Sequence, residues 1–84
     1  MAMDEMVVKE TLDVLTALQG NPCEESTLKR YVNQRLINPQ SSTEFSEQLA
    51  DMKARGWVGY KENDFRKKIW WMTDEGSAQR GRMK

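Results

Sequence analysis

The hydrophobic pattern of the chain changes period at Gly56, and this change constrains the fold more than any other feature of the sequence. Before Gly56, apolar residues recur at helical spacing, which predicts a helix over 43–55. After it, they alternate in two short stretches, which predicts strands over 57–61 and 67–73 joined by a turn at Asn63-Asp64. Glycine can adopt the left-handed backbone conformation that turns a helix sharply into a strand.

Two more helices are expected upstream, over 4–19 and 24–37, the second stopped by Asn38-Pro39. The apolar residues of the first span roughly half its circumference, whereas a surface helix needs a stripe of only ~100°. Two explanations are open. The helix buries a second side against another subunit, with Val8 and Leu12 as candidate dimer contacts, or a small domain wraps around its first helix.

Length and composition fit one small domain. We expect it to cover 1–76 and the basic segment 77–84 to form a flexible tail. Hydrophobic residues make up 38% of the chain, too many for a disordered one. No apolar run approaches the roughly 20 residues needed to span a bilayer, and the acidic start of the chain is unlike a signal peptide. We therefore expect a cytoplasmic protein without a membrane segment.

Common catalytic and metal chemistry is excluded by residue content. The chain has no histidine and a single cysteine, Cys23. It can therefore form neither a zinc site of the usual kind nor a Ser-His-Asp or Cys-His pair. A phosphate-binding G-x-x-x-x-G-K loop is also missing from the sequence. We expect no enzyme activity, no cofactor and no metal, and we interpret Cys23 as a passive residue at a helix start.

Charge is distributed unevenly although the net charge is zero. Residues 1–52 carry four basic and nine acidic groups, and residues 53–84 carry nine basic and four acidic groups. A basic half can attract phosphates even when the whole molecule is neutral.

Two segments resemble known regulators. FSEQLADMKARGWVGY (45–60) resembles the recognition helix and first wing strand of winged-helix transcription regulators, including their Arg-Gly-apolar-Val step. IWWMTDEG (69–76) resembles the last wing strand and Leu-Thr-x-x-Gly corner of MarR- and PadR-type regulators, with Met72 in place of the leucine. The resemblance covers about residues 5–76. It implies a mainly helical α+β fold: a three-helix winged helix-turn-helix with a C-terminal β-hairpin wing.

In such a fold, Trp57 and Val58 would close the core beneath the third helix. Trp70 and Met72 would seal it from the hairpin, and Trp71 would be partly exposed on the other face or would lie against the first helix.

The resemblance implies a DNA-binding transcriptional regulator, with helix 43–55 in the major groove and the basic wing on the DNA backbone. The candidates for reading bases are Thr43, Ser46, Glu47 and Ala50, because small or polar side chains can reach base edges. The candidates for contacting the backbone are the basic residues Lys53, Arg55, Lys61, Arg66, Lys67 and Lys68. A basic hairpin can also be a solvated sheet edge, since lysine discourages edge-to-edge pairing.

One feature opposes DNA binding. Glu44, Glu47 and Asp51 place acidic groups on the third helix, where phosphates would repel them. Winged helices also serve as protein-interaction modules, and an acidic third helix suits that use. The expected partners are therefore double-stranded DNA, with a homodimer through the first helix, or a protein partner in the alternative interpretation.

Overall fold

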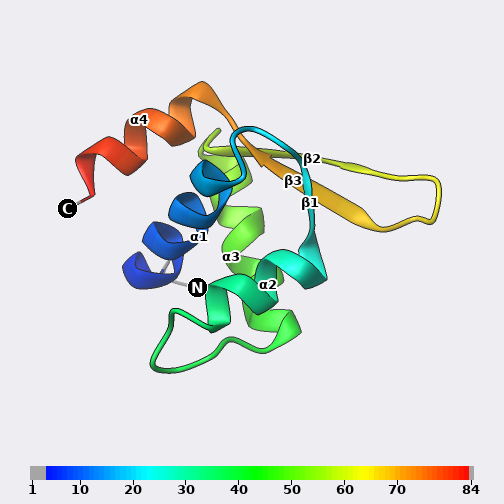
Figure 1. Ribbon diagram of the computed structural model, residues 1–84, viewed down its shortest axis with the longest axis horizontal. Coiled ribbons are helices and arrows are strands. Elements are labelled where there is room, and N and C mark those ends of the chain that lie inside the picture. Colours follow the sequence, from blue (N-terminus) through cyan, green and yellow to red (C-terminus); the bar gives the residue numbers. More distant parts are fainter. Residues whose placement is uncertain (1–3, 84) are drawn as a thin grey trace.

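A computed structural model describes residues 4–83, which form four helices and a three-stranded sheet (Figure 1). In chain order the elements are α1 (Glu5–Ala17), β1 (Cys23–Glu24), α2 (Glu25–Asn33), α3 (Ser42–Ala54), β2 (Val58–Glu62), β3 (Lys68–Met72) and α4 (Asp74–Arg82). The predicted mainly helical α+β class and the order of three helices and a hairpin are confirmed. The hairpin β2–β3 projects from one side of the molecule, and α4 lies on the opposite side.

Helix α1 lies at the centre of the core, where it packs against α2, α3, α4 and β3. Its N-cap is Asp4, whose carboxylate accepts the backbone N–H groups of Met6 and Val7. Val8 and Leu12 are 3% and 0% exposed inside this core. The broad apolar stripe of α1 is therefore buried within the chain, in agreement with the explanation that a small domain wraps around its first helix. Val8 and Leu12 have no surface left for a second copy, which corrects their interpretation as dimer contacts.

The sheet is antiparallel, with strand order β1-β3-β2. Strand β1 was not predicted, and it places Cys23 opposite Trp70 instead of at a helix start. Burial raises the pKa of the Cys23 thiol, and the Glu24 carboxylate beside it raises that pKa further. The thiol is consequently protonated at neutral pH and forms part of the packing of the sheet.

Helix α2 is shorter than predicted, because it ends at Asn33. The Asn33 side chain donates to the carbonyl of Gln40 over 3.0 Å and accepts from the N–H of Gln40 over 2.8 Å. These two bonds close the loop between α2 and α3. Arg35 was expected on the helix but lies in this loop, and its guanidinium is 3.7 Å from the carboxylate of Glu10 on α1.

A compact corner connects the hairpin to its neighbours. Thr73 is the N-cap of α4, and its hydroxyl accepts the N–H of Gly76 over 3.0 Å. The same hydroxyl donates to the carbonyl of Gly56 at the end of α3, and the Thr73 N–H donates to the carbonyl of Trp57 over 3.0 Å. The Thr-x-x-Gly corner of the sequence thus joins the end of α3, both strands and α4.

The interpretation of 77–84 as a flexible tail is wrong for the part that the structure describes. Residues 77–82 continue α4, which packs against α1. The Arg80 guanidinium lies 2.6 Å from the Asp13 carboxylate, and Met83 packs against the core. The domain therefore extends past 76. Lys84 lies outside the described residues.

Gly56 has φ of +82°, as its predicted role requires. Replacing it with valine should lower the free energy of unfolding by ~1–3 kcal/mol, because valine is strained in the left-handed region. A new Cβ would also lie 2.5 Å from Glu75 Oε2, a flexible carboxylate that can move away. Urea unfolding measures the loss. Gly56→Asn should lose less, since asparagine tolerates this conformation, and equal stability of the valine variant and the native protein would contradict the turn.

Candidate nucleic-acid interface

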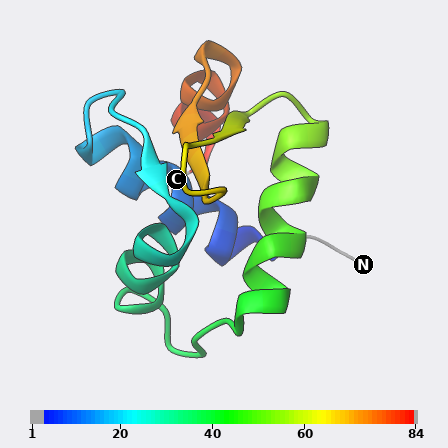
Figure 2. The same ribbon diagram turned by 90° about the vertical axis from the view of Figure 1, so that its right-hand side faces the viewer.

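A groove runs between α3 and the hairpin, and Figure 2 shows these two elements with the hairpin pointing toward the viewer. We call it the α3–hairpin groove, and it is lined by Glu25, Ser46, Ala50, Lys53, Ala54, Tyr60, Lys68 and Trp70. A second hollow continues it along α3 past Ser42, Thr43 and Glu47, and Lys68 borders both. Four elements, α2, α3, β2 and β3, therefore contribute to one surface.

Two lysines are held at this groove by an aromatic ring. Lys53 Nζ, from α3, lies 5.4 Å from the centre of the Tyr60 ring, and Lys68 Nζ, from β3, lies 5.7 Å from it. The Tyr60 ring packs against Trp70 with 4.8 Å between ring centres. Cation–π contacts at exposed sites contribute ~0.5–1 kcal/mol. They position an ammonium group without neutralising it, so both charges remain available to an anion.

Glu25 is the acidic group in the floor of the groove. It is the first residue of α2, where the helix dipole favours a carboxylate. Its Oε1 accepts from Trp70 Nε1 over 3.0 Å, and its Oε2 accepts from the Ser46 hydroxyl over 2.6 Å. One carboxylate thereby connects α2, α3 and β3, and Glu25 acts as a structural link in the groove.

The four base-reading candidates of α3 lie together on its outward side. Thr43 and Ala50 are exposed, and Ser46 and Glu47 are half-buried. All four line the second hollow. Ser46 differs from its predicted role because its hydroxyl proton is donated to Glu25. It can still accept a hydrogen bond, but its donor is used within the fold.

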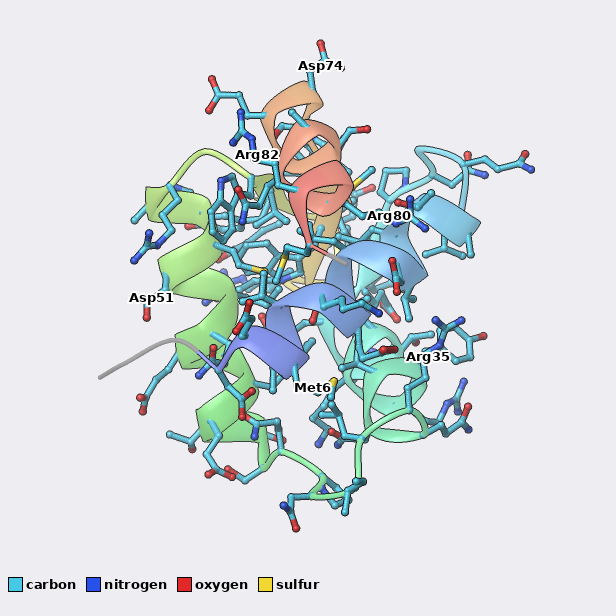
Figure 3. The ribbon with its side chains drawn as sticks, turned by 90° about the vertical axis from the view of Figure 1, so that its left-hand side faces the viewer. Met6, Arg35, Asp51, Asp74, Arg80 and Arg82 are labelled. Carbon is cyan, nitrogen blue, oxygen red and sulfur yellow. The ribbon has the colours of Figure 1, made fainter. Side chains whose placement is uncertain are left out.

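Two of the acids that opposed DNA binding lie away from the groove. At 100° per residue, Glu44 and Asp51 lie about a quarter of a turn round α3 from Thr43 and Ala50. Figure 3 shows Asp51 on the outer side of α3, pointing away from the rest of the molecule. Glu44 is part of a capping box: it accepts the Ser41 N–H over 2.9 Å, and this backbone hydrogen bond, followed by that of the Ser41 side chain, lowers the pKa of Glu44. Glu47 is the α3 acid that borders the candidate surface.

The predicted wing cations do not share one face. Because residues alternate along a strand, Lys68 lies on the same face as Tyr60 and Trp70, while Lys61, paired with Ile69, lies on the other. Lys67 borders a hollow beside the start of α2, and Arg66 lies in the turn. Arg55, at the C-cap of α3, covers the Trp57 ring with 5.5 Å between guanidinium carbon and ring centre, outside the groove.

Ion pairing separates the two sides of the molecule. Within residues 4–83, the basic residues in ion pairs are Lys9, Arg35 and Arg80, which pair with Glu10 and Asp13 of α1. Arg35 and Arg80 are visible on that side in Figure 3. Over the same range, none of the six backbone candidates has a carboxylate within 4.0 Å. Of the nine basic residues in that range without an ion pair, these six lie on α3, the hairpin or the segment between them, and the other three are Lys29, Arg30 and Arg82.

Residues 4–83 contain neither a metal-binding cluster of acidic and cysteine side chains nor a membrane-spanning helix. In that range no group of three or more Cys, Asp or Glu side chains is placed to hold a metal ion. None of the helices there is long and apolar enough to cross a membrane.

Tyr60 and Glu25 were missed by sequence reasoning. Alternation along β2 places Tyr60 on the same face as the buried Val58. The sequence could therefore have predicted that Tyr60 lies on the face of the hairpin that turns toward the core. Nothing local indicates that Glu25 meets Trp70, because 45 residues separate them.

The fold is similar to that of MarR-family regulators of known structure. A MarR-family transcriptional regulator from Silicibacter pomeroyi superposes with a TM-score of 0.79, over 96% of this chain and 49% of that one, at 20% identity. The PcaV transcriptional regulator from Streptomyces coelicolor, in complex with its natural ligand, superposes with a TM-score of 0.64, over 90% and 50% of the two chains, at 23% identity. The chain spans about half the length of these proteins. No protein-family model and no curated protein matches its sequence. The likeness confirms a winged-helix fold of the MarR type.

Proposed function

We propose that this winged-helix domain binds double-stranded DNA as part of a transcriptional regulator. Helix α3 lies in the major groove and the hairpin follows the adjacent backbone. The observation that carries the proposal is a pair of ammonium groups, that of Lys53 on α3 and that of Lys68 on β3. Both lie against the ring of Tyr60. They border the outward side of α3, which carries Thr43, Glu47 and Ala50 and is where a helix must approach base edges.

The roles divide between the two elements. Lys53, Arg66, Lys67 and Lys68 contact phosphates, which positions the domain without selecting a sequence. Thr43, Glu47 and Ala50 face the bases, and Glu47 can accept a hydrogen bond from a cytosine amino group. Support also comes from the fold, which is shared with solved structures described as transcriptional regulators.

A second candidate function is a protein-interaction module that binds no DNA. It is favoured by the carboxylates of Glu25 and Glu47, which border the two hollows and would repel phosphates. The hydrogen bonds that Glu25 accepts from Ser46 and Trp70 reduce its reach toward a ligand, so the first proposal is the stronger one.

Titration of the protein into a short labelled duplex at 50 and 200 mM salt tests the proposal. With four phosphate contacts, log affinity should fall with log salt at a slope of roughly −3.6, so that affinity decreases about 150-fold between the two conditions. A sizing run in parallel gives the stoichiometry of the complex. Failure to bind any duplex at 50 mM salt would reject DNA binding and favour the protein-interaction module.

A further inference from the structure

The turn of the hairpin presents an aromatic ring to solvent. Phe65 is 82% exposed, whereas the other phenylalanine, Phe45, is completely buried. The hairpin extends away from the helices, so none of the other elements within residues 4–83 covers its tip (Figure 1). The exposed ring contributes little buried area to the fold and is accessible to a ligand.

The turn is held in one shape. Asn63 Oδ1 accepts the N–H of Phe65 over 2.9 Å and that of Lys67 over 3.0 Å. Backbone bonds from Asn63 to Lys67 and from Arg66 to Asn63 complete the loop. Arg66 has φ of +59°, a left-handed conformation that is uncommon for a residue other than glycine. The ring of Phe65 is therefore carried on an ordered loop and loses little backbone freedom on binding.

The charges around the ring indicate what it contacts. The hairpin segment 61–68 contains four basic residues and two acidic ones, Glu62 and Asp64. Arg66 and Lys67 directly follow Phe65, and all three are exposed. An apolar ring bordered by cations is complementary to a ligand with anionic edges and an apolar, stackable interior. Double-stranded DNA has this arrangement, with phosphates along the borders of the groove and stacked bases within it.

We propose that Phe65 enters the minor groove as a wedge, partly unstacks one base step and bends the DNA. The inference rests on the proposed function, because α3 in the major groove places the hairpin tip beyond the adjacent phosphates. Apolar side chains inserted at the minor groove kink DNA by about 20–90°. Pyrimidine–purine steps such as TA unstack most easily, so the wedge selects a sequence at a position that α3 does not read.

The test compares the native protein with Phe65→Ala on a duplex that carries a central TA step and 2-aminopurine beside it. The native protein should raise the 2-aminopurine fluorescence and shorten the end-to-end distance in energy-transfer measurements. Phe65→Ala should lose both signals and about tenfold in affinity, as expected for removing one base–aromatic contact. Phe65→Leu should retain most of the bend, because leucine also serves as a wedge.

Ile37→Ala is the matched control. Ile37 is 93% exposed, but it lies in the loop between α2 and α3, away from the hairpin, so its removal should change neither signal. If the native protein binds the duplex and Phe65→Ala gives the same bend and fluorescence, the wedge is wrong and DNA binding stands. If the native protein binds no duplex at 50 mM salt, the proposed function itself fails and the wedge with it.

Discussion

Replacing Gly76 with alanine is expected to destabilise the domain by about 3 kcal/mol, at the upper end of the usual cost of adding atoms to a packed site. A Cβ at this position would collide with the carbonyl of Trp57 and would lie 2.9 Å from Met72 Cγ. The first obstacle is backbone, so it cannot rotate away. Helix α4 would have to separate from the hairpin and lose the bond from Gly76 to Thr73. For a domain of this size the melting temperature should fall by about 12–24 °C.

Gly81→Ala provides the control on the same helix. Among residues 4–83, no atom lies within 4 Å of a Cβ built at Gly81, and alanine is the better helix former by up to ~1 kcal/mol. That variant should therefore be as stable as the native protein or slightly more stable. A Gly76→Ala variant that melts at the native temperature would contradict the packing of α4 against the hairpin base.

Replacing Lys53 and Lys68 together with alanine should give the largest loss of DNA binding. If each ammonium group covers one phosphate, the salt dependence should flatten by about 1.8 in log-log slope, and affinity should fall about 200-fold at 50 mM salt and about 20-fold at 200 mM. The loss should be similar for every duplex sequence, because phosphate contacts carry no sequence information. Fluorescence anisotropy across a salt series measures both quantities.

Lys9→Ala is the matched control for charge. Lys9 Nζ lies 3.5 Å from the Asp13 carboxylate, away from the α3–hairpin groove, so this variant should keep the native slope. The double variant should lose only about 1–2 kcal/mol of stability, from its two exposed cation–π contacts, and should stay folded under the assay conditions. An unaltered slope in the double variant would remove these two residues from the interface even if the protein binds DNA.

The sequence predicted the elements whose signals are local. Helix α3 has a stripe at helical spacing and a capping box at Ser41, and Gly56 marks the start of the hairpin. Strand β1 has only two residues, and it exists because Cys23 pairs with Trp70, far along the chain. Helix α4 contains two glycines and few apolar residues, so its own propensity is low. It is stabilised by the Thr73 cap and by packing against α1, as most helices in proteins depend on tertiary contacts.

The candidate site was predictable in its charges but not in its geometry. Basic residues at 53–68 could be identified directly from the sequence. The distribution of these basic residues over two faces of the hairpin depends on strand register. The register pairs Lys61 with Ile69, on the face opposite that of Tyr60. A shift of one residue in a strand exchanges its faces, and nothing in the turn sequence fixed that register beforehand. The use of the Ser46 hydroxyl proton within the fold could not be predicted either, because it depends on contact with Glu25, 21 residues away in the sequence.

The shared hydroxyl of Thr73 gives the domain a mechanical linkage. It is bonded both to the peptide that ends α3 and to the first turn of α4, while the Thr73 backbone is bonded to the peptide that precedes β2. These bonds attach the first turn of α4 to the Gly56 and Trp57 peptides, which connect α3 to the hairpin. One residue therefore joins, at their common base, α4 and the two elements that carry Lys53 and Lys68.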